Sequence, residues 1–293
     1  MENLSVELIL WLQKTSGTVI EWFFQFISLL GEEYLFIVVL GTVYWAVNKR
    51  TAEYIGTALG ISFSLNNVIK SLTQMPRPFE RYPEVQNLRP GTSTGSSFPS
   101  GHTQGFGSFV FAIAYTLGKR KWWVIAGVLT VLMMISRMYL GVHYLSDVFV
   151  GAALGIMVAL AHGVLFNRMY HDKVKLRRYY GVLIIVFFPF LFFVSNNDFF
   201  QGYGIMAGLI VAASLEKKYV GFSMQKPLRI KVLRVIIGIV LLVVTLTALK
   251  TLFGLFGFVE GTWSYNMLDF LRYFLLANVG FFLYPMVFKH LGY

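Results

Sequence analysis

Residues 145–167 read LSDVFVGAALGIMVALAHGVLFN, an apolar run with one charged side chain, Asp147, in its first turn. A helix needs about 20 mainly apolar residues to cross the hydrocarbon core of a bilayer, which is about 30 Å thick. The run is long enough for this, and its glycines and alanines permit close packing against a neighbouring helix. It is therefore expected to be a membrane-spanning helix.

Similar apolar runs recur along the chain. The further candidate spans are residues 33–49, 52–72, 102–118, 122–138, 180–195, 202–216, 232–257 and 268–288. The whole chain of 293 residues is 56% hydrophobic and 13% charged, whereas about a quarter of the residues in soluble domains are charged. This composition excludes a soluble protein and a disordered one. We predict an all-α fold, a multi-pass transmembrane helical bundle with about nine spans.

The N-terminal residues 4–30 are apolar too, but polar and charged side chains interrupt them. These side chains are Glu7, Lys14, Glu21 and Gln25. An amphipathic helix that lies in the membrane interface is therefore favoured over a span. The first residues, MENLSVELILWLQ, lack the basic start and cleavage site of a signal peptide, so no removal of a leader is expected. The chain then divides into an interfacial segment at 1–31, a core at 32–168 and additional transmembrane helices at 180–293.

The excess of positive charge, +11 in total, falls mostly on one side of the predicted membrane. If the spans alternate in direction, this side carries Lys49, Arg50, Lys119, Arg120, Lys121, Arg168, Lys173, Lys175, Arg177, Arg178, Lys217, Lys218, Lys226, Arg229, Lys231, Arg234 and Lys289. The positive-inside rule makes it the cytoplasmic side, and contact with the bilayer explains the charge without nucleic acid as a partner. The chain has no cysteine, which excludes disulfides, iron–sulfur clusters and thiol nucleophiles.

Three short segments on the opposite side carry the remaining polar chemistry. They are KSLTQMPRP at 70–78, PSGH at 99–102 and SRMYLGVHYLSD at 136–147. Each lies at the end of a predicted span, so they bring Lys70, Arg77 and Arg137 to one depth of the membrane, where uncompensated charge is costly. A phosphate monoester carries about 1.5 to 2 negative charges and strong acceptor oxygens, which match three cations and backbone amides without a metal.

Two histidines and one carboxylate in these segments can carry out a reaction. His143 and Asp147 are four residues apart, which places them side by side on a helix. Asp147 can then accept one ring N–H and leave the other nitrogen of His143 free as a nucleophile. His102 follows a Pro-Ser-Gly turn at the start of a helix, where Ser100 and Gly101 offer polar groups to a phosphoryl oxygen. Its imidazole can protonate the leaving alkoxide and later deprotonate water.

The order and spacing of these residues resemble the three-part signature of the type 2 phosphatidic acid phosphatase superfamily. The matching positions are Lys70, Arg77, Pro78, Pro99, Ser100, Gly101, His102, Ser136, Arg137, His143 and Asp147. The resemblance covers residues 50–165 and implies a membrane helical core and a two-step reaction through a phosphohistidine, with no metal and no cofactor. It assigns His143 as nucleophile, Asp147 as its partner and His102 as general acid and base. It assigns phosphate binding to Lys70, Arg77, Ser100, Gly101 and Arg137, with Ser136 orienting the phosphate or Arg137.

The sequence thus predicts an integral-membrane lipid phosphate phosphatase of a bacterial plasma membrane, with its active site on the extracytoplasmic face. A lipid substrate is favoured because a headgroup phosphate already lies at the depth of the site. The candidate substrates are a polyprenyl diphosphate such as undecaprenyl diphosphate, phosphatidic acid, phosphatidylglycerophosphate and a sphingoid phosphate. A lipid phosphotransferase with the same intermediate and a transporter of phosphate-headgroup lipids remain as alternatives. Vanadium haloperoxidases use a similar signature, but they are soluble. Residues 180–293 show no family motif; shielding of the lipid entry route and a homo-oligomer contact are both open to them.

Overall fold

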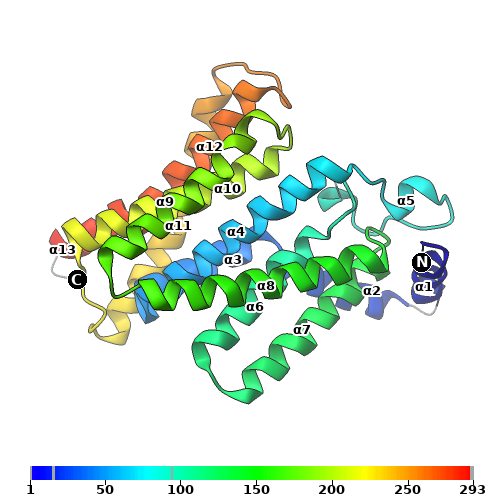
Figure 1. Ribbon diagram of the computed structural model, residues 1–293, viewed down its shortest axis with the longest axis horizontal. Coiled ribbons are helices and arrows are strands. Elements are labelled where there is room, and N and C mark those ends of the chain that lie inside the picture. The colour runs from blue at the N-terminus through cyan, green and yellow to red at the C-terminus, as the bar shows by residue number, and fades with distance from the viewer. Residues whose placement is uncertain (1, 15–16, 94, 291–293) are drawn as a thin grey trace. The chain divides into compact units, whose positions relative to one another are not determined.

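The computed structural model describes residues 2–14, 17–93 and 95–290, and every regular element within them is a helix. In chain order the elements are α1 (Glu2–Lys14), α2 (Thr18–Leu29), α3 (Glu33–Thr42), η1 (Val43–Val47), α4 (Lys49–Thr73), α5 (Pro78–Arg81), η2 (Pro90–Thr92), α6 (Gly101–Leu117), α7 (Arg120–Tyr139), α8 (Leu145–Met169), α9 (Lys173–Phe187), η3 (Phe188–Phe192), α10 (Asn197–Leu215), η4 (Glu216–Val220), α11 (Leu228–Gly254), α12 (Trp263–Asn278), η5 (Val279–Leu283) and α13 (Tyr284–His290). The predicted all-α class is confirmed (Figure 1).

The number of membrane spans is smaller than predicted. The described residues contain five helices that are long and apolar enough to cross a membrane, or six spans if one bent pair is counted. The five are Arg120–Tyr139, Leu145–Met169, Asn197–Val220, Leu228–Gly254 and Trp263–Lys289. The pair, Thr18–Leu29 with Glu33–Val47, is bent by 54°. The predicted count of nine is therefore not confirmed.

Three of the predicted spans fall short for physical reasons. The 25-residue helix α4 carries Lys49, Arg50 and Glu53 near its start and Lys70 in its last turn. Helix α6 has 17 residues, and α9 has 15 before it continues into the short 3₁₀ turn η3. An apolar pattern does not by itself separate a helix that packs among other helices from one that crosses the bilayer.

The predicted interfacial helix at 1–31 is not confirmed either. The segment forms α1 and α2, while residues 1 and 15–16, and 291–293 at the other end of the chain, lie outside the described residues. In α1, Val6 and Ile9 are buried in an apolar cluster that includes Val85. In α2, the Gln25 amide donates to the carbonyl oxygen of Leu88 at 2.6 Å. Of the polar side chains that interrupt the apolar pattern, Gln25 therefore binds protein, and the segment packs on the chain itself.

The chain forms two compact units. Unit 1 comprises Met1–Phe36 and Leu65–Val164, and unit 2 comprises Ile37–Ser64 and Leu165–Tyr293. Helices α1 and α2 belong to the same unit as the three motifs. All the residues of the expected site thus lie in unit 1. The division into segments at 1–31, 32–168 and 180–293 stays a prediction.

In unit 1, α6 and α8 approach each other closely because glycines face the contact. A Cβ atom at Gly155 would lie 2.2 Å from the carbonyl oxygen of Gln104, and one at Gly151 would lie 2.8 Å from that of Ser100. The Ser100 N–H also donates to the carbonyl oxygen of Asp147 at 3.0 Å. These contacts fix the start of α6 against the start of α8.

In unit 2, α10 and α12 pack together with similar intimacy. A Cβ atom at Gly204 would lie 2.4 Å from the carbonyl oxygen of Phe270. Three π-helical turns, η1, η4 and η5, interrupt the α-helical geometry of this unit. Such turns are rare in proteins, and those that do occur often lie at functional sites.

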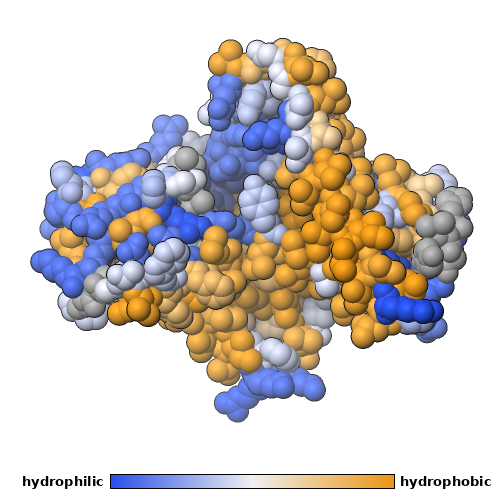
Figure 2. Space-filling view, turned by 180° about the vertical axis from the view of Figure 1, so that it is seen from behind, coloured by the Kyte–Doolittle hydropathy of each residue, from blue (hydrophilic) through white to orange (hydrophobic). Residues whose placement is uncertain are grey.

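Apolar side chains are exposed along the long helices. On α11 they include Ile236, Val240 and Val244, which are 55%, 57% and 57% exposed. Figure 2 shows such residues, in orange, over much of one face of the molecule, with hydrophilic residues gathered in separate patches. A soluble protein rarely exposes apolar surface on this scale, whereas lipid covers it in a membrane.

Candidate active site

The three motifs lie at helix ends of unit 1. Lys70 is in the last turn of α4, Arg77 is the N-cap of α5, and Arg137 is in the last turn of α7. His102 is in the first turn of α6, which Ser100 caps. Asp147 is in the first turn of α8, and His143 lies just before that helix. Helix ends can hold a cluster of polar side chains in a membrane protein, because their unpaired backbone groups and connecting loops keep these side chains away from lipid.

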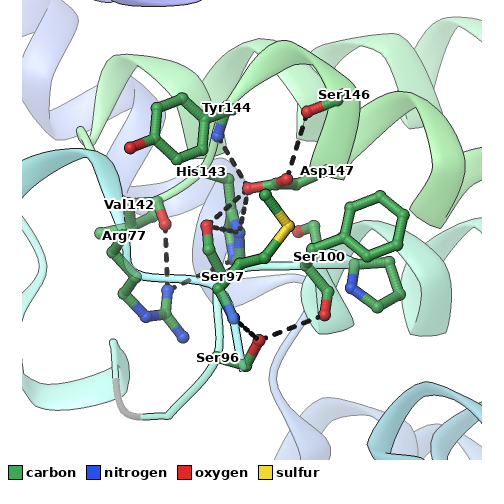
Figure 3. Close-up of polar contacts among 12 residues, drawn as sticks. Arg77, Ser96, Ser97, Ser100, Val142, His143, Tyr144, Ser146 and Asp147 are labelled. Atoms are coloured by element: carbon green, nitrogen blue, oxygen red, sulfur yellow. Dashed lines mark hydrogen bonds and ion pairs between the residues drawn. The ribbon is translucent and has the colours of Figure 1, made fainter. Parts of the chain in front are cut away.

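The carboxylate of Asp147 is held beside the imidazole of His143. Its Oδ2 atom lies 3.4 Å from the Nδ1 atom of His143, and both side chains are buried. The same oxygen accepts hydrogen bonds from the Ser97 hydroxyl at 2.5 Å and from the Tyr144 N–H at 2.9 Å. The Ser146 hydroxyl donates to Oδ1 at 3.4 Å (Figure 3). A carboxylate fixed in this way orients the histidine ring and stabilises a positive charge on it.

The other nitrogen of His143 faces an arginine. The Nη1 atom of Arg77 lies 3.4 Å from the Nε2 atom of His143 (Figure 3). The guanidinium is itself held by the carbonyl oxygens of Val142 and Gly95, each at 3.0 Å. Burial, followed by the charges of Arg77, Arg137 and Lys70, lowers the pKa of His143 well below its usual value of 6.5. The imidazole is therefore neutral at pH 7, and this is the form that can act as a nucleophile.

Arg137 presents a guanidinium edge that no protein group uses. Its Nη1 atom donates to the Ser28 hydroxyl at 2.6 Å, whereas its Nε and Nη2 atoms are buried without a hydrogen-bond partner. The Nε2 atom of His102 is likewise buried without a partner. Buried polar atoms are nearly always paired in native proteins. These unpaired donors therefore point to a polar ligand, and a phosphoryl group supplies the acceptors they lack.

The PSGH segment is fixed as a helix N-terminus. The Ser100 hydroxyl accepts hydrogen bonds from the Thr103 hydroxyl at 3.0 Å and from the Thr103 N–H at 3.5 Å. The Asn66 amide donates to the Pro99 carbonyl oxygen at 3.3 Å. A Cβ atom at Gly101 would lie 3.2 Å from the side-chain oxygen of Asn66, so this position is crowded. The first N–H groups of α6 are thus positioned to bind an anion.

Ser136 binds a backbone group of α2 rather than a residue of the three motifs. Its hydroxyl donates to the carbonyl oxygen of Phe24 in α2 at 2.7 Å. This bond joins the last turn of α7 to the N-terminal helices next to Arg137. It gives Ser136 a contact through which it can position Arg137.

Sequence reasoning missed two residues that complete the site. Ser97 binds the carboxylate of Asp147 from 50 positions away, and Ser28 binds Arg137 from 109 positions away. Ser97 lies in the Gly/Ser/Thr-rich stretch before Pro99, which marks it only as part of a loop. Nothing in the sequence around Ser28 distinguishes it from an ordinary helix residue.

Comparison with known proteins identifies the family. A model of the PAP2 superfamily matches residues 51–175, and a model described as "PAP2 superfamily phosphatase, transmembrane extension" matches residues 200–293. The chain is 34% identical over 157 residues to the bacitracin transport permease protein BcrC of Bacillus licheniformis. The alignment covers 47% of this chain and 75% of that protein. It is 35% identical over 139 residues to an undecaprenyl-diphosphatase of Sulfolobus acidocaldarius, which covers 46% of this chain and 65% of that protein.

A further relative and two solved structures also match this chain. The chain is 37% identical over 103 residues to phosphatidylglycerophosphatase B of Bacillus subtilis, which covers 32% of this chain and 47% of that protein. The crystal structure of Aquifex aeolicus LpxE matches with a TM-score of 0.50 and 26% identity, over 54% of this chain and 94% of that chain. The crystal structure of a PAP2-type phosphatidylglycerolphosphate phosphatase from Bacillus subtilis shares the fold, with a TM-score of 0.50 and 23% identity. The match covers 57% of this chain and 86% of that chain. The chain belongs to the PAP2 superfamily, and it is a membrane phosphatase of that class.

The match at 200–293 corrects the view that the C-terminal helices carry no family signal. This extension consists of the largely apolar helices α10 to α13, which carry no short charged motif of the kind found at 70–78, 99–102 and 136–147. The helices are a described part of the superfamily.

Proposed function

We propose that this protein removes phosphate from a membrane lipid through a phosphohistidine formed on His143. The observation that carries the proposal is the pair of buried contacts on that ring. Asp147 lies 3.4 Å from Nδ1, and the Arg77 guanidinium lies 3.4 Å from Nε2. One nitrogen is oriented by a carboxylate, and the other faces a phosphate-binding cation. A binding protein has no need of an oriented nucleophile.

In the first step, Nε2 of His143 forms a bond to phosphorus while the bond to the lipid oxygen breaks. Asp147 stabilises the positive charge that develops on the ring. Lys70, Arg77 and Arg137, with the N-terminus of α6, bind the phosphoryl oxygens. His102 gives its proton to the departing lipid oxygen. Ser100 and Gly101 contribute to the N-terminus of α6, and Ser136 positions Arg137 or the phosphate.

In the second step, water attacks the phosphorus of the phosphohistidine. His102, which gave up a proton in the first step, accepts one from the water. The new P–O bond forms as the P–N bond breaks, which releases inorganic phosphate and restores neutral His143. No metal and no cofactor take part in either step.

A lipid substrate on the extracytoplasmic side suits the site. The third motif joins the end of α7 to the start of α8, which are both candidate membrane spans. The ends of membrane spans lie near the interface, where a headgroup phosphate lies. The relatives named above include an undecaprenyl-diphosphatase and a phosphatidylglycerophosphatase. We therefore propose that its substrate is a polyprenyl diphosphate, phosphatidic acid, phosphatidylglycerophosphate or a sphingoid phosphate. The exposed apolar face of α11 suits contact with lipid or with a second copy of this chain. The mass of the protein in nanodiscs distinguishes these possibilities, since a second copy would give the mass of a dimer.

The side of the membrane is testable because the chain lacks cysteine. Glu84 lies exposed in the loop after α5, and Lys121 lies exposed near the start of α7. An impermeant thiol reagent added to intact cells should label Glu84→Cys and should not label Lys121→Cys. The reverse pattern would place the site on the cytoplasmic side.

The activity itself is tested by phosphate release in detergent with EDTA across the four lipid classes and glucose 6-phosphate. We expect release from at least one lipid and its loss in His143→Ala. A folded protein that releases phosphate only when a second lipid alcohol is supplied would be a phosphotransferase. Release by His143→Ala at the wild-type rate would exclude the proposed mechanism.

A further inference from the structure

A second guanidinium is buried in unit 2, on α11. Arg234 is 2% exposed, and among the described residues no carboxylate forms an ion pair with it. Its Nη1 atom donates to the carbonyl oxygens of Ser223 at 3.0 Å and Trp45 at 3.3 Å. The rings of Phe288 and Phe222 lie against it, with centroids 4.4 and 5.1 Å from Cζ. Carbonyls and rings do not neutralise a full charge in an apolar interior, so the residue lacks an anion.

The free edge of Arg234 has the same pattern as that of Arg137 in the active site. In both arginines Nη1 is bonded to a protein oxygen, whereas Nε and Nη2 are buried without a partner. These two nitrogens form one side of the guanidinium, and their N–H groups together bind two oxygens of one phosphate or carboxylate. Of the buried side chains that the structure describes, these two arginines alone leave that whole edge unpaired. Arg272 lacks a partner only at Nε, and its Nη2 binds Asp269 at 2.7 Å.

The carboxylate of Glu216, which binds the backbone of Phe222 beside Arg234, already has a cation. Glu216 binds the Lys49 ammonium at 2.8 Å and accepts a hydrogen bond from the Phe222 N–H at 3.2 Å. Lys49 also lies over the ring of Phe222, 4.2 Å from its centroid, so two cations contact the same aromatic side chain. Since Lys49 balances the charge of Glu216, the positive charge of Arg234 remains uncompensated. The local excess of positive charge selects an anion.

The backbone around Arg234 is irregular where it meets this side chain. Trp45 lies in the π-helical turn η1, and Tyr284, whose hydroxyl donates to the Arg234 carbonyl oxygen at 2.8 Å, follows the π-helical turn η5. Phe222 follows η4, and the next residue, Ser223, is exposed. The loop 221–227 therefore lies against the guanidinium, since its Ser223 carbonyl oxygen accepts from Nη1.

From these contacts we propose that Arg234 and the rings of Phe222 and Phe288 form a second phosphate-binding site, separate from the catalytic one. Its ligand is a phosphate group held by Nε and Nη2. The headgroup of an anionic phospholipid and free phosphate share this chemistry. The exposed apolar side chains of α11 suit contact with lipid, which favours the lipid headgroup.

The test uses the full chain, purified in a neutral detergent and freed of lipid. Its unfolding temperature is measured against increasing dihexanoyl-phosphatidylglycerol, inorganic phosphate, or dihexanoylglycerol, which lacks the phosphate. Phosphatidylglycerol should raise the unfolding temperature of the wild type, and dihexanoylglycerol should not. The apparent affinity should fall about tenfold or more in Arg234→Gln, because a bidentate charged contact is lost. Arg229→Gln removes the same charge from an exposed position of the same helix and should behave as the wild type.

Binding to the active site is separated by Arg137→Gln. If the site at Arg234 exists, the rise persists in Arg137→Gln and weakens in Arg234→Gln. A rise that disappears in Arg137→Gln and persists in Arg234→Gln would overturn the proposal, as would equal weakening in Arg234→Gln and Arg229→Gln. A rise with inorganic phosphate alone that depends on Arg234 would support the site and assign it to free phosphate. If Arg234→Gln does not fold, Arg234→Lys keeps the charge without the paired N–H groups and should show the same weakening.

Discussion

Replacing Ser97 with alanine tests how the nucleophile is oriented. Three donors bind the carboxylate of Asp147, and the Ser97 hydroxyl makes the shortest contact, 2.5 Å, compared with 2.9 Å for the Tyr144 N–H and 3.4 Å for the Ser146 hydroxyl. Ser97 is fully buried, so water does not replace it readily. A hydrogen bond to a charged group contributes about 1.5–3 kcal/mol. If the transition state depends on that bond, kcat should fall by roughly 10- to 100-fold.

The assay is the release of phosphate by the purified protein at saturating lipid substrate, followed across pH. Ser97→Ala should lower kcat with little change in KM, because the Ser97 hydroxyl contacts Asp147 and, at 3.5 Å, the Nδ1 atom of His143, and so acts on the nucleophile. Ser146→Ala is the matched control, since it removes the longest of the three contacts and should reduce kcat by less than about threefold. Equal kcat values for Ser97→Ala, Ser146→Ala and the wild type would refute the role given to Ser97. A rise in KM alone would assign Ser97 to substrate binding.

Three further predictions concern other parts of the site. Because the pKa of His143 lies below 6.5 and its neutral form reacts, kcat/KM should hold as pH falls to 6.5 and decline only below it, and a decline centred above 6.5 would contradict this. Ser28→Ala removes the acceptor of Arg137 and should raise KM by about tenfold, a larger effect than on kcat, in substrate titrations; an unchanged KM would show that Arg137 needs no support. Gly155→Ala forces a Cβ to within 2.2 Å of the Gln104 carbonyl oxygen and should destabilise the protein by about 1–3 kcal/mol in unfolding measurements. Gly127→Ala, which meets open space inside α7, should instead raise stability by up to about 1 kcal/mol, and equal destabilisation by both changes would contradict the role given to Gly155.

The charged residues of the site could be predicted because local spacing carries them. His143 and Asp147 are four residues apart in the chain, and the structure places their side chains in contact. Arg77 could be predicted as part of the same site because its motif, like theirs, ends an apolar run on the same predicted side. Such short-range patterns need only the geometry of one helix end.

The supporting contacts could not be predicted, because they join distant parts of the chain. Ser28 meets Arg137 only when α2 packs against α7, and no local pattern encodes that pairing. The same limit applies to the membrane spans. The N-terminal residues looked like an interfacial helix, yet Gln25 finds its partner in Leu88, 63 positions away. Polarity that looks unsuited to a span was in this case satisfied by protein.

The most direct test of the proposed mechanism is to isolate the covalent intermediate. The protein is mixed with a lipid phosphate carrying ³²P, quenched with alkali during turnover, digested and mapped. The mechanism predicts an acid-labile, alkali-stable label on the peptide that contains His143, and none in His143→Asn. Label on another residue, or turnover by His143→Asn at the wild-type rate, would contradict it.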